Sequence, residues 1–432
     1  MRVLMFGWEF PPHISGGLGT ASYGLTKGMS SLNDLEVIFV VPKAWGDEEP
    51  VKIRLIGANK VPVAFKKVHY KGFRRELEKI EVSSRIVPYT NPEDFWKRIS
   101  SEQSGQNLVV QTNNNGMVDF SGKYDSSLME EIYKYSVVAA VIAEENEFDI
   151  IHAHDWLAYP AGIAAMEVSG KPLIIHVHAT DFDRSGGNVN PDVYRIEKLG
   201  MDAASKIITV SNLTREIVIN KYNIPPEKVE TVYNAVEPVK ITGESISEKG
   251  FEDKVVTFLG RITMQKGPEY FIEAAHKVIK AMPNVRFVMA GSGDMMERMM
   301  RRAAALRITD KFHFTGFLKG KDVFTMLGMS DVYIMPSVSE PFGISPLEAM
   351  QSNVPVIISK QSGVSEILTH AVKTDFWDID AIADAIYGIL NYPALAKMFI
   401  KNGREEVVRL KWDNSARHVR DIYYRVLWQN KN

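Results

Sequence analysis

Short apolar runs alternate with amphipathic stretches along the chain, and the alternation starts twice. The first round begins at VLMF (3–6) and the second at VTFLGR (256–261). Further runs are VIFVV (37–41), DIIHAHD (149–155), PLIIHVHA (172–179), KIITVS (206–211), ETVYNAV (230–236), VRFVMAG (285–291), KFHFTGF (311–317), VYIMPS (332–337) and VPVIIS (354–359). They are continuously apolar, which is typical of parallel strands covered by helices on both faces. The pattern predicts an α/β fold of two doubly wound domains.

The helical stretches between these runs complete the two rounds. Helix patterns lie around residues 20–32 and near 268–281, each between the first two strands of its round. The tail 413–430 is an amphipathic helix, for which Asp413 or Asn414 is the expected cap. We expect this helix to return to the first domain.

Changes in composition along the chain give the domain boundaries. We expect an N-terminal domain at 1–236 and a C-terminal domain at 255–411. The polar, weakly periodic segment 237–254 is the expected linker. Charged and turn-rich sequence at about 43–125 indicates an insertion in the first domain, with NNNG (113–116) as a hairpin turn.

Composition narrows the class of protein. The 432 residues carry a net charge of −2, so no basic field favours nucleic acid or a membrane surface as a partner. There is no cysteine, which excludes disulfides and thiolate chemistry. No run approaches the roughly 20 apolar residues of a membrane span. The start MRVLMFGWEFPP does not resemble a signal peptide, so we expect a cytoplasmic location. The oligomeric state stays open.

The segment SEPFGISPLEAM (339–350) is the most informative of the candidate site. It follows the apolar run at 332–337 and leads into a predicted helix at 345–352. Ser345 is the expected N-cap of that helix, with Pro346 at its first position. The segment therefore lies past the carboxyl end of a strand, where open α/β sheets bind ligands.

Two acids in this segment suit a polar ligand. Glu340 lies in the loop and Glu348 in the first turn of the predicted helix, where backbone N–H groups favour an anion. Gly343 lets a ligand come close to the backbone between them. The alternative is that both acids are ordinary, one solvated in a loop and one complementing the helix dipole.

Two further loops carry groups that suit phosphate. In GRITMQKG (260–267), Arg261 and Lys266 could neutralise a diphosphate without a metal ion, although basic loop residues are more often solvated. In SGGLG (15–19), Gly16 and Gly17 open a predicted helix and would let amides approach an anion. The spacing is not GxGxxG and lacks the acid of nicotinamide-binding proteins, which disfavours a dehydrogenase.

Histidine pairs end two strands of the first domain. HAHDW places His152 and His154 two residues apart before Asp155, and HVHA does the same with His176 and His178. Strand alternation puts both members of a pair on one face. We expect the first of each pair to be a hydrogen-bonded core residue and the second to be functional. A zinc site is the alternative, but a fourth ligand is missing from the pattern.

Together these segments resemble retaining glycosyltransferases of the GT-B fold, in which two Rossmann-like domains face a central crevice. The resemblance is strongest to the glycogen synthase and starch synthase branch of the Glu-x7-Glu superfamily, with the sucrose synthase-like group beside it. It rests on GGLG, HAHDW, HVHA, VSNLTREI, VYNAV, GRITMQKG, AGSGD and SEPFGISPLEAM. Only 43–125 lacks a matching segment.

The resemblance implies a role for each matching residue. Glu348 would hold the ribose, and Arg261 and Lys266 the diphosphate, while Glu340 and His178 would contact the transferred sugar. The implied catalytic residues are His178, Arg261, Lys266 and Glu340, and Asp155 would face the acceptor. The implied donor-binding residues are Gly16, Gly17, Arg261, Lys266, Gly316, Phe317, Glu340, Gly343, Ile344, Ser345 and Glu348.

The implied reaction moves a glucosyl unit, with retention, from UDP-glucose or ADP-glucose to an α-glucan or oligosaccharide. The resemblance implies no cofactor and no metal. Glycogen synthases typically carry Lys where this chain has Ser15 and Gly16, which counts against ADP-glucose. Alternatives are transfer to a sucrose- or trehalose-type, cell-surface or lipid-linked acceptor, a GT-B nucleotide-sugar epimerase, and a non-catalytic glycan-binding protein.

Overall fold

The chain divides into two compact units. The computed structural model describes residues 1–14, 16–49, 52–63, 112–113, 115–122, 124, 127–238 and 252–430, so Ser15 and most of the expected insertion and linker lie outside the described residues. Unit 1 comprises Met1–Phe182, Asn188–Ala235 and Trp412–Asn432. Unit 2 comprises Asp183–Gly187 and Val236–Lys411.

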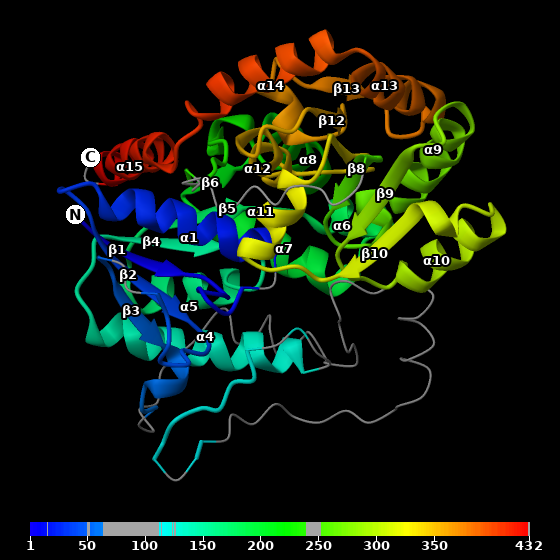
Figure 1. Cartoon of the computed structure of the whole chain (residues 1–432). Helices are drawn as coiled ribbons and strands as arrows, with labels where there is room; N and C mark the ends of the chain where they lie inside the picture. The colour runs from blue at the N-terminus through cyan, green and yellow to red at the C-terminus, as the bar shows by residue number, and fades with distance from the viewer. Residues whose placement is uncertain are drawn as a thin grey trace. The chain divides into compact units, whose positions relative to one another are not determined.

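Unit 1 is built on a sheet of seven parallel strands in the order β3-β2-β1-β4-β5-β6-β7 (Figure 1). Its strands are β1 (Arg2–Phe6), β2 (Glu36–Val41), β3 (Arg54–Gly57), β4 (Ile150–His154), β5 (Leu173–Val177), β6 (Lys206–Thr209) and β7 (Val229–Thr231). Its helices are α1 (Gly17–Ser30), α4 (Leu128–Glu145), α5 (Tyr159–Ser169), α7 (Pro191–Ala203), α8 (Asn212–Tyr222) and α15 (Trp412–Gln429), and α6 (Asp181–Ser185) crosses the boundary between the units.

Helices cover both faces of this sheet. In Figure 1, α1 and α15 lie along one face, with α4 and α5 on the other. The inner strands β4 and β5 are buried at every residue, which explains why their sequences are apolar apart from three histidines. The Tyr423 hydroxyl of α15 reaches His152 of β4, and Ser415 Oγ donates to the backbone oxygen of Tyr233 at 2.7 Å. The last helix is therefore part of the core of unit 1.

Unit 2 repeats the same plan with a sheet of six parallel strands in the order β10-β9-β8-β11-β12-β13. Its strands are β8 (Lys254–Leu259), β9 (Val285–Ala290), β10 (Phe312–Gly316), β11 (Val332–Met335), β12 (Val356–Ser359) and β13 (Val372–Thr374). Its helices are α9 (Pro268–Ala281), α10 (Met296–Ala305), α11 (Lys321–Gly328), α12 (Ser345–Gln351), α13 (Ile379–Asn391) and α14 (Pro393–Val407), with short 3-10 turns η4 (Met264–Lys266) and η6 (Gly363–Glu366) near its loops.

The strand orders define where each unit can bind a ligand. Both orders contain the arrangement 3-2-1-4-5-6 of dinucleotide-binding folds, in which connections leave the first strand in opposite directions. The reversal falls between β1 and β4 in unit 1 and between β8 and β11 in unit 2. In folds of this kind, ligands bind at the carboxyl ends of the strands that flank the reversal.

Several elements begin or end in the structure at residues other than those predicted. The helix predicted at 20–32 is α1, Gly17–Ser30, and the strand expected at 230–236 forms ladder pairs only over Val229–Thr231. Of the predicted NNNG turn, Asn114 lies outside the described residues; Gly116 N donates to Asn113 O, and Thr112 and Val118 form an antiparallel bridge, as expected for a hairpin. Neither Asp413 nor Asn414 caps the last helix, since Trp412 is already helical.

Among the helices of the described residues, none combines the length and apolar character that crossing a membrane requires.

Candidate functional site

The candidate residues of unit 2 lie in the loops at the carboxyl end of its sheet. Arg261 and Lys266 lie between β8 and α9, and Glu340 follows β11, so both loops flank the point where the strand order reverses. Gly316 ends β10 on the outer side of β9. The structure thus brings the basic pair and the acid to one edge of unit 2.

Lys266 and Glu340 form an ion pair. Lys266 Nζ donates to Glu340 Oε2, and Ser337 Oγ donates to the same oxygen at 3.2 Å. The side chain of Glu340 is only 8% exposed, whereas that of Lys266 is 24% exposed and open to a ligand. Two donors on one oxygen hold this enclosed carboxylate in place.

Backbone hydrogen bonds hold the two loops together. Val338 N donates to Gln265 O at 2.9 Å, which joins the loop after β11 to the loop after β8. Glu340 N donates to Gln361 O at 2.9 Å, and Gly363 N donates to Glu340 O at 2.8 Å. Glu340 is therefore tied on both sides, so its position does not depend on a ligand.

Gly343 permits the sharp bend between Glu340 and α12. Its φ is +100°, and an added Cβ would lie 3.1 Å from the terminal atoms of Met335 and 3.2 Å from Cγ of Glu340. A side chain would be strained by both the backbone angle and the contacts. The prediction of Ser345 as N-cap is wrong, because Ile344 is the N-cap and Ser345 is already helical. Ser345 Oγ instead accepts from the Tyr333 hydroxyl at 2.8 Å, which leaves it no capping role.

Glu348 lies in the first turn of α12, as the sequence predicts. Its side chain is half-buried, and removal from water raises the pKa of its carboxyl to about 7. A carboxyl that titrates near neutrality exchanges a proton readily when a hydroxyl or a charge approaches it.

Gly316 and Phe317 form an open part of this edge. Gly316 has a φ of +73° and nothing within 4 Å of the position that a Cβ would take, and Phe317 is 52% exposed. The ammonium of Lys319 lies 5.5 Å from the centre of the Phe317 ring. An exposed ring of this kind suits stacking against a flat ligand group.

In unit 1, the glycine loop leads from β1 into α1. Gly16 is the N-cap in extended conformation, and Gly17 is exposed, with open space where a Cβ would lie. Because no side chain caps the first turn, the approach to the backbone there is unobstructed.

His154, Asp155 and His178 lie together at the ends of the neighbouring strands β4 and β5. His154 Nδ1 lies 2.9 Å from His178 Nε2, and Asp155 N donates to His176 O at 2.9 Å. Asp155 is buried and has a φ of +62°, which is rare for a residue other than glycine. Backbone strain of this kind is concentrated at functional sites, which supports Asp155 as a candidate.

At the same strand ends, the imidazoles of His152, His154 and His176 form a buried stack. Their ring centres lie 4.4–5.4 Å apart and their planes within 25° of parallel. His178 stacks on His176 at 4.4 Å, as His154 does on His152, so each pair does share one face. The expectation that the first of each pair is hydrogen-bonded holds for His152, whose Nδ1 contacts the Tyr423 hydroxyl. It is wrong for His176, since neither ring nitrogen has a partner among the described residues.

The three rings could be read as a metal centre, because one nitrogen of each lies within 4.8 Å of the others. Zinc requires nitrogen lone pairs that converge at about 2.0–2.1 Å. Rings with nearly parallel, facing planes direct their in-plane lone pairs alongside one another instead. Burial lowers the pKa of His152 to about 3 and holds the pKa of His154 and His176 well below the usual value, so all three are neutral. The geometry favours packed neutral imidazoles.

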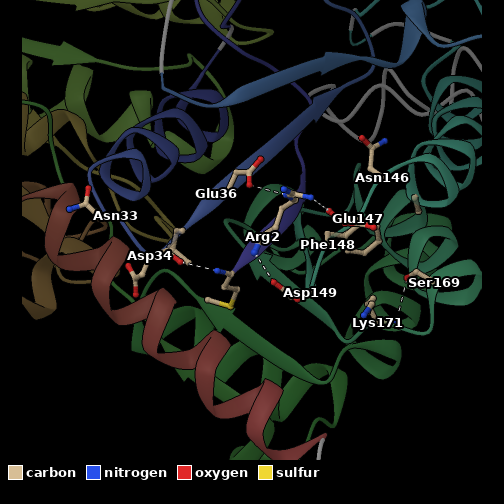
Figure 2. A pocket seen from close by; sticks show the side chains of 13 residues that line it. Arg2, Asn33, Asp34, Glu36, Asn146, Glu147, Phe148, Asp149, Ser169 and Lys171 are labelled. Atoms are coloured by element: carbon tan, nitrogen blue, oxygen red, sulfur yellow. Dashed lines mark hydrogen bonds and ion pairs between the residues drawn. The ribbon is translucent and has the colours of Figure 1, made fainter.

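A cavity of about 820 Å³ lies at the opposite edge of the unit 1 sheet (Figure 2). It is lined at the amino ends of β1, β2 and β4, and Figure 2 shows Arg2 bonded to Glu36, to the backbone oxygen of Glu147 and to Asp149. Arg2 Nε bonds Glu36 at 2.9 Å, and the Arg2 amide donates to Asp149 at 2.8 Å. No residue predicted for the site lines this cavity.

Sequence reasoning missed the residues that support Glu340 and α12 from below. Ser337 is fully buried beneath Glu340, and Tyr333 is a fully buried residue of β11 whose hydroxyl reaches Ser345. The signal that could have found them is a hydroxyl within an otherwise apolar strand, because a buried hydroxyl requires a polar partner.

Comparison with known families and proteins adds to this geometry. Residues 243–406 match the family described as glycosyl transferases group 1, and residues 126–240 match glycosyltransferase family 4. An uncharacterized glycosyltransferase of Methanocaldococcus jannaschii is 28% identical, with 98% of each chain covered. A 2-deoxystreptamine N-acetyl-D-glucosaminyltransferase of Niallia circulans is 26% identical over 61% of this chain and 73% of its own. A glycogen synthase of Mycobacterium tuberculosis is 20% identical over 98% of this chain and 94% of its own.

Solved structures share the fold over the whole chain. The sucrose-phosphate synthase of Thermosynechococcus elongatus has a TM-score of 0.72 at 16% identity and covers 99% of both chains. The Anabaena protein HepE, solved in complex with UDP and glucose, has a TM-score of 0.68 at 16% identity, with 98% of this chain and 99% of its own covered. With two doubly wound sheets, loops at both reversal points and these structural neighbours, the chain has the GT-B fold, and most of its length matches glycosyltransferase family models.

Proposed function

We propose that this protein transfers a glucosyl unit from UDP-glucose or ADP-glucose to a hydroxyl of an α-glucan or oligosaccharide, with retention of the anomeric configuration. The observation that carries the proposal is the edge of unit 2, where Arg261, Lys266, Glu340 and Glu348 flank the reversal of strand order. Two cations and two acids at one edge match a ligand that has a diphosphate at its centre and hydroxyl groups at both ends.

The basic pair would act on the leaving group. When the bond between sugar and diphosphate breaks, negative charge accumulates on the diphosphate oxygens. Arg261 offers a planar fork of donors and Lys266 a compact ammonium, so together they stabilise that charge. No metal ion is needed for this step, and we propose that transfer is independent of metals and cofactors.

The two acids would bind the hydroxyl groups at either end of the donor. Glu340 is held by Lys266 and Ser337 through one oxygen, which leaves its other oxygen for a hydroxyl of the sugar. Glu348 would accept from the ribose, and the bend at Gly343, Ile344 and Ser345 would lie against the donor between them. Gly316 and Phe317 would receive the base, and an exposed ring there fits stacking on a flat heterocycle.

Unit 1 would supply the remaining groups. Gly17 has open space beside its backbone, and we propose that Gly16 and Gly17 bind the diphosphate and that His178 holds a hydroxyl of the transferred sugar. Asp155, with its unusual backbone, would face the acceptor. Retention through attack on the same face requires no carboxylate nucleophile, in contrast to retaining glycosidases.

Glucose and a glucan are proposed on the likeness of HAHDW and HVHA to the glucan synthases, supported by the full-length match to a glycogen synthase. The match to a 2-deoxystreptamine transferase keeps a different acceptor as the second candidate. A cytoplasmic location remains our expectation.

The test is to incubate the protein with UDP-glucose or ADP-glucose and maltooligosaccharides and record proton NMR spectra of the fresh product. We expect an α-anomeric signal on a lengthened oligosaccharide. A β-anomeric signal from these α-linked donors would exclude retention. Transfer only to a lipid, a phosphate or an aminocyclitol would exclude the glucan while leaving the donor site in place.

A further inference from the structure

Tyr333 lies at the junction of the two loops that carry the proposed donor site. It is a residue of β11, pairs in register with Thr257 of β8, and is fully buried. Its hydroxyl donates to Ser345 Oγ at 2.8 Å and, more weakly, to the backbone oxygen of Leu259 at 3.4 Å. One side chain therefore contacts both the start of α12 and the end of β8.

These two contacts fix the distance between the loop after β8 and the start of α12, which would bind two parts of the same ligand. Leu259 ends β8 and is followed at once by the loop of Arg261 and Lys266, whereas Ser345 begins the helix that carries Glu348. In the proposed function, the first loop holds the diphosphate and Glu348 holds the ribose. The span between those groups must match the covalent spacing of a nucleoside diphosphate.

We propose that Tyr333 is a positioning residue that sets the spacing between the diphosphate-binding loop and the ribose-binding helix. The proposal rests on the proposed function, since it assigns those two roles. Tyr333 touches neither half of the donor, and its hydroxyl acts through Ser345 and Leu259.

The chemistry of the hydroxyl agrees with this role. Burial, together with the nearby carboxyls of Glu340 and Glu348, raises the pKa of Tyr333 well above its ordinary value. The hydroxyl stays protonated throughout the working range of pH, so it remains a donor and its contacts do not change with pH. A phenylalanine would fill the same space in the core but could not hold Ser345.

The variant Tyr333→Phe separates positioning from packing. We expect its affinity for UDP or ADP, measured by titration calorimetry, to fall about two- to tenfold, which corresponds to the loss of one hydrogen bond. Weak binding of uridine or adenosine alone, and of pyrophosphate alone, measured by NMR titration, should be unchanged. Each of these ligands occupies only one half of the site, so the spacing between the halves does not affect it. In turnover, KM for the donor should rise while kcat stays near that of the unaltered protein.

Two further variants support the comparison. Ser345→Ala should reproduce the effect, and the double variant should be no weaker than either single one, because both remove the same contact. Thr257→Val is the matched control. It removes a buried hydroxyl from the same pair of strands, where Thr257 Oγ bonds Ser330 Oγ at 2.6 Å, and should lower stability without changing nucleotide affinity.

Each outcome is decisive. If the unaltered protein binds no nucleoside diphosphate, the proposed function fails. If it binds one and Tyr333→Phe binds it equally well, only the role of Tyr333 is wrong. If the affinities for nucleoside, pyrophosphate and nucleoside diphosphate all fall equally, the site is damaged as a whole, and the role of Tyr333 is again wrong. Should Tyr333→Phe fail to fold, Ser345→Ala decides by the same three ligands.

Discussion

At the scale of single residues, the pairing of Lys266 with Glu340 raises the question of how a ligand enters between them. Separating a partly buried ion pair is costly when one charge is left without a partner. A diphosphate brings its own negative charge, so Lys266 would keep an anionic partner after binding. Glu340 would keep the hydrogen bond from Ser337 and gain a sugar hydroxyl. The pair thus holds both side chains in place before the donor arrives.

Replacement of either basic residue tests this arrangement. Arg261→Ala and Lys266→Ala should each fold normally and reduce turnover about a hundredfold or more, because each removes charge stabilisation from the leaving diphosphate. Lys277→Ala is the control, since Lys277 of α9 forms an exposed ion pair with Asp380 of α13 and should leave the rate unchanged. Near-normal turnover in both site variants would refute the diphosphate assignment.

Metal removal gives an independent check at the same scale. If Arg261 and Lys266 take the place of a cation, the rate with a saturating donor should be the same before and after dialysis against a chelator. Loss of activity that a divalent ion restores would contradict the proposal. It would also call for direct metal analysis of the histidine stack of His152, His154 and His176.

At the scale of elements, the bend before α12 is the feature on which the site depends most. Gly343 has a left-handed backbone and close neighbours, so a side chain there would push the loop away from Met335 and Glu340. The displacement would move Glu340 relative to Lys266, and would move the first turn of α12 with it. The loop therefore depends on one glycine for its shape.

Gly343→Ala should lower the free energy of unfolding by about 1–3 kcal/mol and weaken nucleotide binding, as expected for a residue in a strained region. Gly388→Ala is the matched control. Gly388 lies within α13 with nothing within 4 Å of the added Cβ, so the change should stabilise the protein by about 0.5–1 kcal/mol and leave binding unchanged. Urea unfolding and nucleotide titration measure both effects. Unaltered nucleotide affinity in Gly343→Ala would show that the bend is not needed for binding.

How well sequence predicts an element depends on whether its signal is local. The helix α9 was predicted closely, because Gly267 and Pro268 mark its start and its apolar positions repeat at helical spacing. The run ETVYNAV was predicted as a strand to 236, yet only Val229–Thr231 pair, since a buried loop can be as apolar as a strand. The short edge strands β3 and β13 were not predicted because RLIG and VKT are too brief to form a pattern.

The same distinction applies to the candidate site. The loops of Arg261, Lys266 and Glu340 could be placed from the sequence, because each follows an apolar strand. The contact from Tyr333 to Ser345 could not, because it depends on how β11 and α12 pack in three dimensions. The roles of these residues in the reaction stay predictions until the variants are measured.

At the scale of the whole molecule, the two units should respond to acid in opposite ways. In unit 1, burial keeps His152, His154 and His176 neutral. Below the ordinary histidine pKa of about 6.5, the unfolded chain therefore binds more protons than the folded chain. Stability is therefore lost progressively as pH falls from 6.5 toward 3. In unit 2, the raised pKa of Glu348, about 7, means that the folded state binds the extra proton between about 4.5 and 7. That contribution is complete below pH 4.5 and is lost as pH rises through 7.

Calorimetric unfolding at pH 7 and pH 5 measures the difference. We expect the transition of unit 1 to move to lower temperature, with His152 alone costing about 2 kcal/mol at pH 5. The transition of unit 2 should move less, or upward. A unit 1 transition that does not respond to acid would mean that the stack already accepts protons when folded.

The course of the chain also decides the order in which the protein can be completed during synthesis. The first 182 residues of the chain, which belong to unit 1, are synthesised early. The last helix of unit 1, α15, is synthesised only after unit 2 is complete at Lys411. Domains generally fold as units while the chain emerges. Unit 2 can therefore finish before unit 1, which must wait for Tyr423 to cover His152. Limited proteolysis of ribosome-bound chains stalled past residue 411 should find unit 2 protected and unit 1 still cleavable, and protection of unit 1 should appear only once α15 has emerged.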